Sequence, residues 1–439
     1  MSSVKIALAA LLLGLTGLWF MADSLYSTPF DYRAFRDAAI QLSGILALGA
    51  MCAATLLAAR PVWLEPAFGG LDKMYRLHKW LGIAALVASV GHWWFATGSR
   101  LFSSGGEGPH GPRGGGEQTL SLIDSLRGLS HPVGEWGFYL VVALVLIALL
   151  TRIPYRWFAY SHIVITPVFL ALVFHGVLLA TPAYWSQPVG WALALLCIAG
   201  VAAAAVVLAR RFGILRGAGG TVEAQTWYPE LRVLETVIVL DEHWTGHQPG
   251  QFAFVTTSRL EGAHPFSIAS DWDPASRRIV FIAKELGDYT ARLRDEFLPG
   301  RRVAVEGPYG RFDFEDDRPT QIWVGAGVGI TPFIGRMQRI AGQGQAQAIH
   351  LFHTTEEVSE AALDKMRADA AAAGVALHLT LSKRDPLLDG ERIRATVPDW
   401  PSASLWFCGP AGFGATLRKD FLAHGFSPTH FHQERFSMR

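Results

Sequence analysis

Long apolar segments dominate the N-terminal half of the chain and restrict it to folds that a lipid bilayer accepts. A spanning helix needs about 20 mostly apolar residues. Segments of roughly that length cover residues 4–22, 37–59, 76–97, 135–151, 157–181 and 188–209. Beyond Arg211 the density of charged residues rises. We therefore predict a multidomain protein that begins with a six-helix transmembrane bundle over residues 1–212, its first segment being kept as a membrane anchor.

The charges in the short loops predict the orientation of the bundle. Ten Lys and Arg residues flank the segments on one side, and five flank them on the other. The richer side normally faces the cytoplasm. We therefore expect both termini and the C-terminal half in the cytoplasm, with the chain crossing the inner (plasma) membrane several times.

The overall composition narrows the classes of partner and cofactor. The chain has 439 residues, of which 51% are hydrophobic, and its formal net charge is +1. This near-neutral balance gives no field that would attract nucleic acid. The three cysteines, Cys52, Cys197 and Cys408, are too few and too scattered for a disulfide framework or for a site built from four thiolates.

Four histidines lie inside the apolar segments. His78 and His92 are 14 residues apart in the third segment, and His162 and His175 are 13 apart in the fifth. In the predicted topology both segments run from the cytoplasmic side of the membrane to the outer side. His78 and His162 should therefore lie at one depth in the bilayer, and His92 and His175 at another. Fourteen residues span about 21 Å of helix. The spacing of 13 leaves an angular mismatch, which Pro167 could relieve by loosening a turn.

Two interpretations of these histidines are open. Ionisable groups at this depth are costly and tend to mark function, and haem iron accepts axial histidines while the porphyrin fills its other positions. Paired depths on two helices therefore favour two haems b, with all four histidines as iron ligands. The alternative is four separate hydrogen bonds between helices. Arg76, Lys79 and Arg156 could meet haem propionates or be ordinary cytoplasmic-side charges.

Residues 222–316 contain short alternating strands and predict an antiparallel β-barrel. The motif HPFSIAS lies within it. A flat ring system with a phosphate tail needs a ring contact, a hydroxyl and a donor, which Phe266, Ser267 and His264 offer, with Pro265 between them. The following GDYT motif, from Gly287 to Thr290, opens a short helix whose free N–H groups would face an anion. Taken alone, GDYT indicates only a helix start.

Residues 319–439 alternate strands with helical segments and predict a doubly wound α/β nucleotide-binding domain. A buried strand runs into a turn with Gly325, Gly327 and Gly329, and a helix follows. These glycines allow a pyrophosphate to approach the backbone, so we expect a dinucleotide at the carboxyl ends of the strands.

Two further strand ends in this domain carry candidate binding groups. Ser382, Lys383 and Arg384 could hold a 2′-phosphate, which favours NADPH over NADH, or could form a solvated basic turn. Cys408, followed by Gly409, would approach the nicotinamide ring or be inert core.

The histidine pairs, together with HPFSIAS, GDYT, GPYG, GAGVGITP and FCGP, resemble the NADPH oxidase and ferric reductase superfamily over nearly the whole chain. The size is similar to that of a bacterial member. The resemblance implies FAD at the barrel motifs and a nicotinamide dinucleotide at the glycine turn, where Thr331 and Pro332 begin the helix. The ending HFHQERFSMR resembles the family's C-terminus, so Phe436 would cover the flavin and act with Cys408 in catalysis.

The resemblance implies electron transfer from cytoplasmic NADPH, through FAD and two haems, to an extracytoplasmic ferric chelate or O2. Family oxidases carry a further histidine at the position of Ala96, and its absence weakens the case for a dedicated superoxide producer. The alternatives are a membrane-anchored flavin reductase without haem, and electron supply to a quinone or a periplasmic partner. A purely structural membrane module would leave the nucleotide motifs unexplained. We expect small-molecule donors and acceptors and lipid contact, without a need for a partner subunit.

Overall fold

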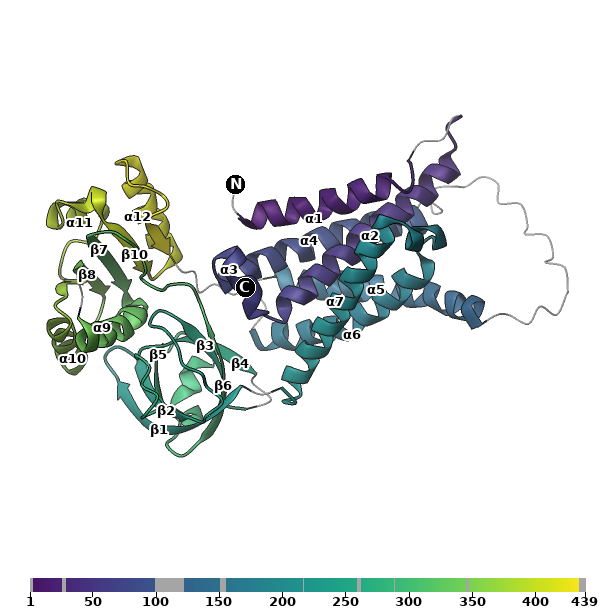
Figure 1. The fold of residues 1–439 in the computed structure, drawn as a ribbon. Coiled ribbons are helices and arrows are strands. Elements are labelled where there is room, and N and C mark those ends of the chain that lie inside the picture. The colour runs from purple at the N-terminus through teal and green to yellow at the C-terminus, as the bar shows by residue number, and fades with distance from the viewer. Residues whose placement is uncertain are drawn as a thin grey trace. The chain divides into compact units, whose positions relative to one another are not determined.

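The computed structural model describes residues 3–25, 29–98, 122–150, 155–215, 217–258, 262–287, 289–344 and 347–433. The chain divides into two compact units, Met1–Arg210 and Arg211–Met438. The first is helical and the second is built on two sheets (Figure 1). Each unit is described separately.

Six long helices form the first unit. They are α1 (Ser3–Phe20), α2 (Tyr32–Ala58), α4 (Leu71–Ala96), α5 (Leu122–Leu149), α6 (Tyr155–Leu179) and α7 (Pro188–Arg211). Five of them, all except α4, are long and apolar enough to cross a membrane. The helix α4 has the length, but His78, Lys79 and His92 lower its hydropathy. The prediction of six spans is therefore confirmed for five.

Helix packing in this unit follows two main pairings. The helix α4 packs along α2, and α6 packs along α5. A core cluster of buried side chains, among them Trp19, Phe169 and Leu193, joins α1, α2, α6 and α7. Short connectors complete the unit: η1 (Val62–Leu64), α3 (Glu65–Phe68) and η3 (Pro182–Ser186).

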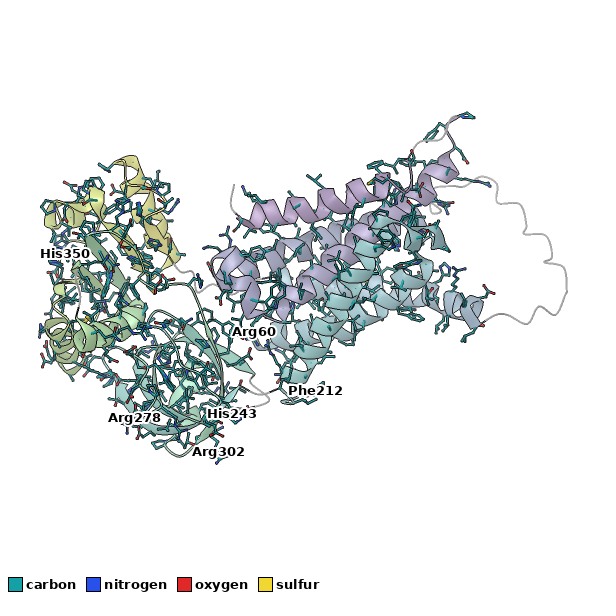
Figure 2. All side chains as sticks on the ribbon, in the orientation of Figure 1. Arg60, Phe212, His243, Arg278, Arg302 and His350 are labelled. Atoms are coloured by element: carbon teal, nitrogen blue, oxygen red, sulfur yellow. The ribbon has the colours of Figure 1, made fainter. Side chains whose placement is uncertain are left out.

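The second unit begins with a six-stranded antiparallel sheet. Its strands are β1 (Ala218–Tyr228), β2 (Val233–Leu240), β3 (Phe252–Thr256), β4 (Ala263–Ser267), β5 (Arg278–Lys284) and β6 (Arg302–Tyr309), in the order β4-β3-β6-β1-β2-β5. Charged side chains such as Arg278 and Arg302 remain exposed on it (Figure 2). The predicted barrel is not confirmed, because the edge strands β4 and β5 do not pair as a ladder. A single isolated bridge joins Ile268, just after β4, to Phe281 in the middle of β5.

A five-stranded parallel sheet follows. Its strands are β7 (Thr320–Ala326), β8 (Ala348–Thr355), β9 (Ala376–Leu381), β10 (Ser404–Cys408) and β11 (Phe431–Gln433), in the order β11-β10-β7-β8-β9. The helices α9 (Thr331–Gln343) and α10 (Glu360–Ala372) contribute to one core cluster, and α11 (Gly390–Thr396) and α12 (Ala411–Ala423) contribute to another.

Alternate residues of β7 show that these clusters lie on opposite faces of the sheet. Trp323 belongs to the first cluster, whereas Ile322 and Val324 belong to the second. Successive side chains of a strand point to opposite faces, so helices cover both sides. All seven residues of β7 are buried, as expected for a central parallel strand. The doubly wound arrangement agrees with the sequence pattern.

Candidate functional site

The four histidines predicted as iron ligands meet as two pairs between α4 and α6. The ring centroids of His78 and His162 are 5.8 Å apart, and those of His92 and His175 are 6.2 Å apart. We call these the first and the second histidine pair. Imidazole nitrogens bind metal ions at about 2 Å, so two rings on opposite sides of one ion have centres about 6 Å apart. Both separations fit such an ion, and both pairings are those that the sequence predicts.

In the first pair, one imidazole is fixed through its Nδ1 atom. His78 Nδ1 lies 2.8 Å from the carbonyl oxygen of Ala54 on α2. A carbonyl oxygen only accepts, so Nδ1 carries the proton and Nε2 keeps a free lone pair. His162 differs, because its buried Nδ1 has no partner among the described residues. Its ring packs on Phe158, with centroids 5.0 Å apart.

In the second pair, both imidazoles are fixed in this way. His92 Nδ1 lies 2.9 Å from the carbonyl oxygen of Ile40, and His175 Nδ1 lies 2.8 Å from that of Ser130. Metal-binding histidines commonly donate their second N–H to such an acceptor, which fixes the ring and raises its basicity. Three of the four rings therefore already have the hydrogen bonding of a metal ligand.

Glycines make room for the second pair. A Cβ atom at Gly134 of α5 would lie 2.1 Å from Cε1 of His175, and one at Gly44 of α2 would lie 3.1 Å from Nδ1 of His92. Contacts below 3.0 Å do not occur for real side chains, so His175 keeps this position only because residue 134 is glycine.

The donor set fits haem better than a metal bound by protein alone. Among the described residues, no group of three or more His, Cys, Asp or Glu side chains gathers as a metal site. Two imidazoles at each level are the number that a haem iron accepts, because the porphyrin occupies its remaining positions.

Phe169 and three basic residues lie on the same two helices as the histidines. Phe169 is 2% exposed and packs in the helix core. Arg76 and Lys79 are exposed on α4. The side chain of Arg156 lies outside the described residues.

The first four residues of the HPFSIAS motif lie in the edge strand β4, where they divide between two environments. Phe266 is 8% exposed and packs in the sheet core against Phe281 and Phe297. His264 instead stacks on Tyr289, with ring centroids 3.6 Å apart and planes at 10°. Sequence reasoning did not identify Tyr289. Pro265 and Ser267 are partly exposed opposite Phe254 and Phe252 of β3.

The GDYT motif leads into a short helix, as its residues suggest. The 3-10 turn η4 begins at Thr290, and the helix α8 (Leu293–Glu296) follows. The hydroxyl of Thr290 accepts from the backbone N–H of Leu286 and Gly287, at 2.7 and 2.9 Å. The hydroxyl therefore stabilises its own turn in this structure.

The glycine turn meets the end of β10. Gly325 and Cys408 are direct partners across β7 and β10. A Cβ atom at Gly329 would lie 2.2 Å from the carbonyl oxygen of Cys408, so the two chain segments touch backbone to backbone. Gly327 has a φ of +57°, a value that glycine adopts readily. Thr331 and Pro332 begin α9 directly afterwards.

The basic turn 382–384 follows β9, which lies beyond β8 from the glycine turn. Lys383 Nζ is 3.2 Å from Glu357 Oε1, and both side chains are about half exposed. Ser382 Oγ donates to the carbonyl oxygen of Thr355. Arg384 is exposed beside them.

A buried histidine that sequence reasoning missed lies behind the glycine turn. His353 of β8 is 7% exposed, and its Nδ1 is 3.0 Å from the carbonyl oxygen of Gly325. Burial lowers the pKa of His353 to about 4, against the opposing effect of this hydrogen bond. Its signal in the sequence is the second histidine of the run AIHLFH, at the end of an apolar segment. Phe436, the predicted flavin cover, lies outside the described residues.

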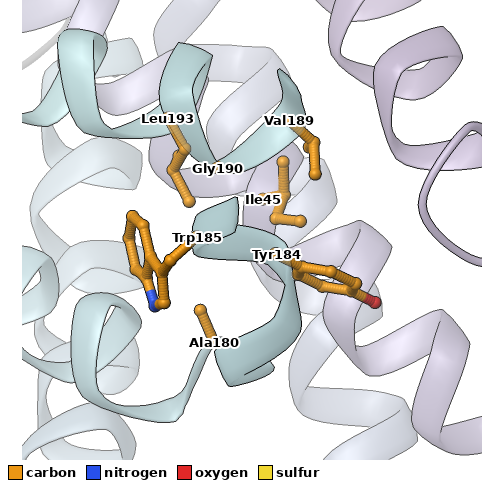
Figure 3. Close-up of a pocket in the computed structure, with 7 residues that line it drawn as sticks. All are labelled: Ile45, Ala180, Tyr184, Trp185, Val189, Gly190 and Leu193. Atoms are coloured by element: carbon orange, nitrogen blue, oxygen red, sulfur yellow. The ribbon is translucent and has the colours of Figure 1, made fainter. Parts of the chain in front are cut away.

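A small apolar pocket lies between η3, α2 and α7 (Figure 3). Its lining residues are Ile45, Ala180, Tyr184, Trp185, Val189, Gly190 and Leu193. The hydroxyl of Tyr184 accepts from Trp19 Nε1 at 3.1 Å and donates to Asp23. No lining residue is charged, and we assign no ligand to this pocket.

Two segments of the chain match known families. Residues 43–173 match the ferric reductase like transmembrane component, and residues 233–313 match an FAD-binding domain. The first segment includes all of the first histidine pair and His92, and ends two residues before His175. The second includes the HPFSIAS and GDYT motifs.

Individual proteins are similar to part of this chain. The ferredoxin–NAD(+) reductase component of the alkene monooxygenase system of Xanthobacter autotrophicus is 28% identical over 174 residues, which are 37% of this chain and 53% of that protein. The tert-butanol monooxygenase / tert-amyl alcohol desaturase reductase subunit of Aquincola tertiaricarbonis is 30% identical over 148 residues, 32% of this chain and 42% of that protein. A cytochrome P450 reductase of Amycolatopsis has a TM-score of 0.45 at 20% identity, covering 50% of this chain and 69% of that one.

The chain spans about half the length of the curated relatives it matches. Those relatives are named as reductase or electron-transfer components of oxygenase systems, whereas the ferric reductase match covers the helices that carry the histidines. The chain thus joins a segment that matches a ferric reductase like transmembrane component to a segment that matches an FAD-binding domain, a combination that resembles the ferric reductase and NADPH oxidase superfamily.

Proposed function

We propose that the chain carries electrons from NADPH on the cytoplasmic side of the inner membrane to an acceptor on the other side, using FAD and two haems b. The observation that supports this most strongly is the pair of histidine pairs at two depths, each with its rings about 6 Å apart. When bound, FAD accepts a hydride from the nicotinamide, and the haem irons carry single electrons between the membrane faces.

The histidine pairs would hold the iron of two haems: His78 and His162 would bind that of the first, and His92 and His175 that of the second. The carbonyl oxygens of Ala54, Ile40 and Ser130 keep three of these rings in the tautomer whose Nε2 can bind iron. With two imidazoles offered to each haem, the arrangement would favour reduction of an acceptor that does not bind the iron.

The nucleotide-binding groups would act from the second unit. Gly329 touches Cys408 backbone to backbone, and nothing lies within 4 Å of the position that a Cβ atom would take at Gly327. Both observations support the approach of a dinucleotide to the backbone at the carboxyl ends of β7 and β10. Gly409 extends that surface. Thr331 and Pro332 begin the helix beside it, and the basic turn Ser382–Lys383–Arg384 would take a 2′-phosphate and so select NADPH over NADH.

The flavin-binding groups would be His264, Ser267, Gly287 and Thr290, with Phe436 covering the ring from the C-terminus. Ser267 is partly exposed and offers a hydroxyl. The stacked rings of His264 and Tyr289 offer a flat, partly exposed surface. Phe266 would support the site from the sheet core, since its ring packs against Phe281 and Phe297.

The acceptor separates the proposed activities, and one experiment distinguishes them. The purified protein is reconstituted in liposomes with NADPH, and superoxide yield is compared with ferric-chelate reduction in air and without oxygen. Iron reduction that persists anaerobically and dominates in air would establish a ferric reductase. A signal sensitive to superoxide dismutase that accounts for the NADPH consumed would establish an oxidase. Dye reduction at the flavin, without haem bands or reduction across the bilayer, would contradict the proposal.

A further inference from the structure

Two of the three cysteines meet in the core of the first, helical unit, which we call the transmembrane unit. Cys52 of α2 and Cys197 of α7 are 1% and 6% exposed, and their sulfur atoms are 4.0 Å apart. They are 145 positions apart in the sequence, so helix packing alone brings them together. Both are free thiols, and neither belongs to the proposed haem or nucleotide sites.

A glycine lets the two helices approach closely at this point. Gly200 lies one turn beyond Cys197, and a Cβ atom there would be 3.1 Å from Cα of Cys52 and 2.9 Å from Cζ of Phe169. Small residues permit such close contact of membrane helices. A disulfide requires Cα atoms within about 4.4–6.8 Å of each other and sulfur atoms about 2.05 Å apart. The sulfur atoms need to move together by roughly 2 Å to reach that length.

The helix α2, which carries Cys52, also positions the histidine rings of α4. Ala54, two residues after Cys52, supplies the carbonyl oxygen that accepts from His78. Ile40, twelve residues before Cys52, supplies the one that accepts from His92. A covalent link between α2 and α7 at Cys52 therefore lies close to Ala54, the hydrogen-bond partner of His78. It lies far along α2 from Ile40, the hydrogen-bond partner of His92.

We propose that Cys52 and Cys197 form a modification site at which hydrogen peroxide makes a disulfide, fastening α2 to α7 and altering the hydrogen bond to His78. One thiol attacks the O–O bond, giving a sulfenic acid and one water. The second thiol then attacks that sulfur and releases the second water. Two thiols and one peroxide thus give one disulfide and two waters, with two electrons passing from sulfur to oxygen.

The surroundings decide the rate and the choice of oxidant. Apolar burial disfavours the thiolate, so the reaction is slow compared with that of an exposed cysteine. Burial also excludes protein and glutathione thiols from the sulfur atoms, so a small neutral oxidant is required and the disulfide persists once formed. The thiol chemistry needs neither haem nor nucleotide and stands independently of the proposed function.

Counting thiols tests the proposal. The full-length protein in membranes is exposed to hydrogen peroxide or kept reduced, then denatured, alkylated with N-ethylmaleimide and analysed by mass spectrometry. We expect three alkylated cysteines in the reduced protein and one, Cys408, after oxidation, with a peptide that links Cys52 to Cys197. The Cys197→Ala variant should keep both of its thiols, and Cys408→Ala should lose both. Three alkylated cysteines after oxidation, a link to Cys408, or oxygen added without a link would overturn the site.

A second readout tests the effect on the histidines. Oxidation should shift the midpoint potential of one haem in the wild-type protein and of neither in Cys197→Ala. A complete disulfide with both potentials unchanged would overturn the coupling to His78. A protein without haem would contradict the proposed function while leaving the thiol count informative.

Discussion

The two units hold their candidate binding groups in contrasting ways. In the transmembrane unit, the backbone carbonyls of neighbouring helices fix the rings of His78, His92 and His175 and leave each Nε2 free. In the second unit, polar side chains satisfy one another or their own turns. Lys383 pairs with Glu357, and Thr290 bonds its own backbone.

This contrast indicates where each unit is sensitive to change. Rings fixed by packed helices are preorganised, so a ligand finds them in place and a small steric change displaces them. Groups that already have protein partners exchange those partners when a ligand binds, so their contribution is reduced by competition. In the first unit we therefore expect a small increase in side-chain volume beside a histidine to cause a large loss of ligand binding. In the second unit we expect a change of charge to alter nucleotide affinity by a moderate factor.

The largest effect is expected from His92→Leu, which removes one ligand of the second pair. Haem content should fall from two to one per chain, and reduction of an external acceptor should fall to background. NADPH-dependent reduction of a soluble dye at the flavin should persist, because that chemistry lies in the other unit. Unchanged external reduction would show that the second pair is not on the electron path.

Glycine substitutions test the dependence of the transmembrane unit on shape. Gly134→Ala should displace His175, because the new Cβ lies 2.1 Å from its ring, and should remove most of one haem equivalent. Gly44→Ala, whose Cβ meets His92 at 3.1 Å, should cause a partial loss. Gly82→Ala on α4 is the matched control, since nothing lies within 4 Å of its Cβ. Absorption spectra of the three purified variants measure their haem content, which should rise from Gly134→Ala through Gly44→Ala to Gly82→Ala. Equal haem content in all three would contradict the dependence on shape.

A graded effect is expected at the basic turn. Replacing Lys383 by Ala removes a charge-assisted hydrogen bond worth about 1.5 kcal/mol, which should raise the KM for NADPH about tenfold and leave that for NADH unchanged. Steady-state dye reduction with each nucleotide measures this. Glu357→Gln is the control, because it removes the competing carboxylate and should lower the KM for NADPH. Equal changes for both nucleotides would exclude contact with the 2′-phosphate.

The smallest effect concerns stability and pH. Burial lowers the pKa of His353 to about 4 in the folded state, while an unfolded histidine titrates near 6.5. The unfolded chain therefore binds the extra proton between these values, and stability falls as the pH is lowered through that window. From pH 7 to 6 the loss should be roughly 1 kcal/mol or less. Urea unfolding of wild type and His353→Gln at both pH values should show a smaller loss in the variant, and equal losses would contradict the assignment.

The sequence predicts the transmembrane site well because helix geometry converts spacing into position. Intervals of 14 and 13 residues place His78 with His162 and His92 with His175, as the structure shows. The partners of Nδ1 were not predictable, since a backbone carbonyl is the same at every residue and only packing selects Ala54. The mean hydropathy of α4 is too low for a predicted membrane span because His78 and His92, the candidate ligands, are themselves polar.

The second unit is predictable in its strands and less so in its contacts. The parallel sheet and the meeting of Gly325 with Cys408 follow from parallel strands ending at one edge. The placement of Phe266 in the core depends on the alternation of β4, and the stack of His264 on Tyr289 joins residues separated by β5. Such contacts between distant segments have no signature in local sequence.

The most direct test of the account is the haem content of the intact, purified protein, measured as pyridine haemochrome against protein concentration. The histidine pairs predict two haems b per chain, both low-spin with two histidine ligands. One haem or none in a protein that still reduces dyes with NADPH would contradict the account and leave a membrane-anchored flavin reductase.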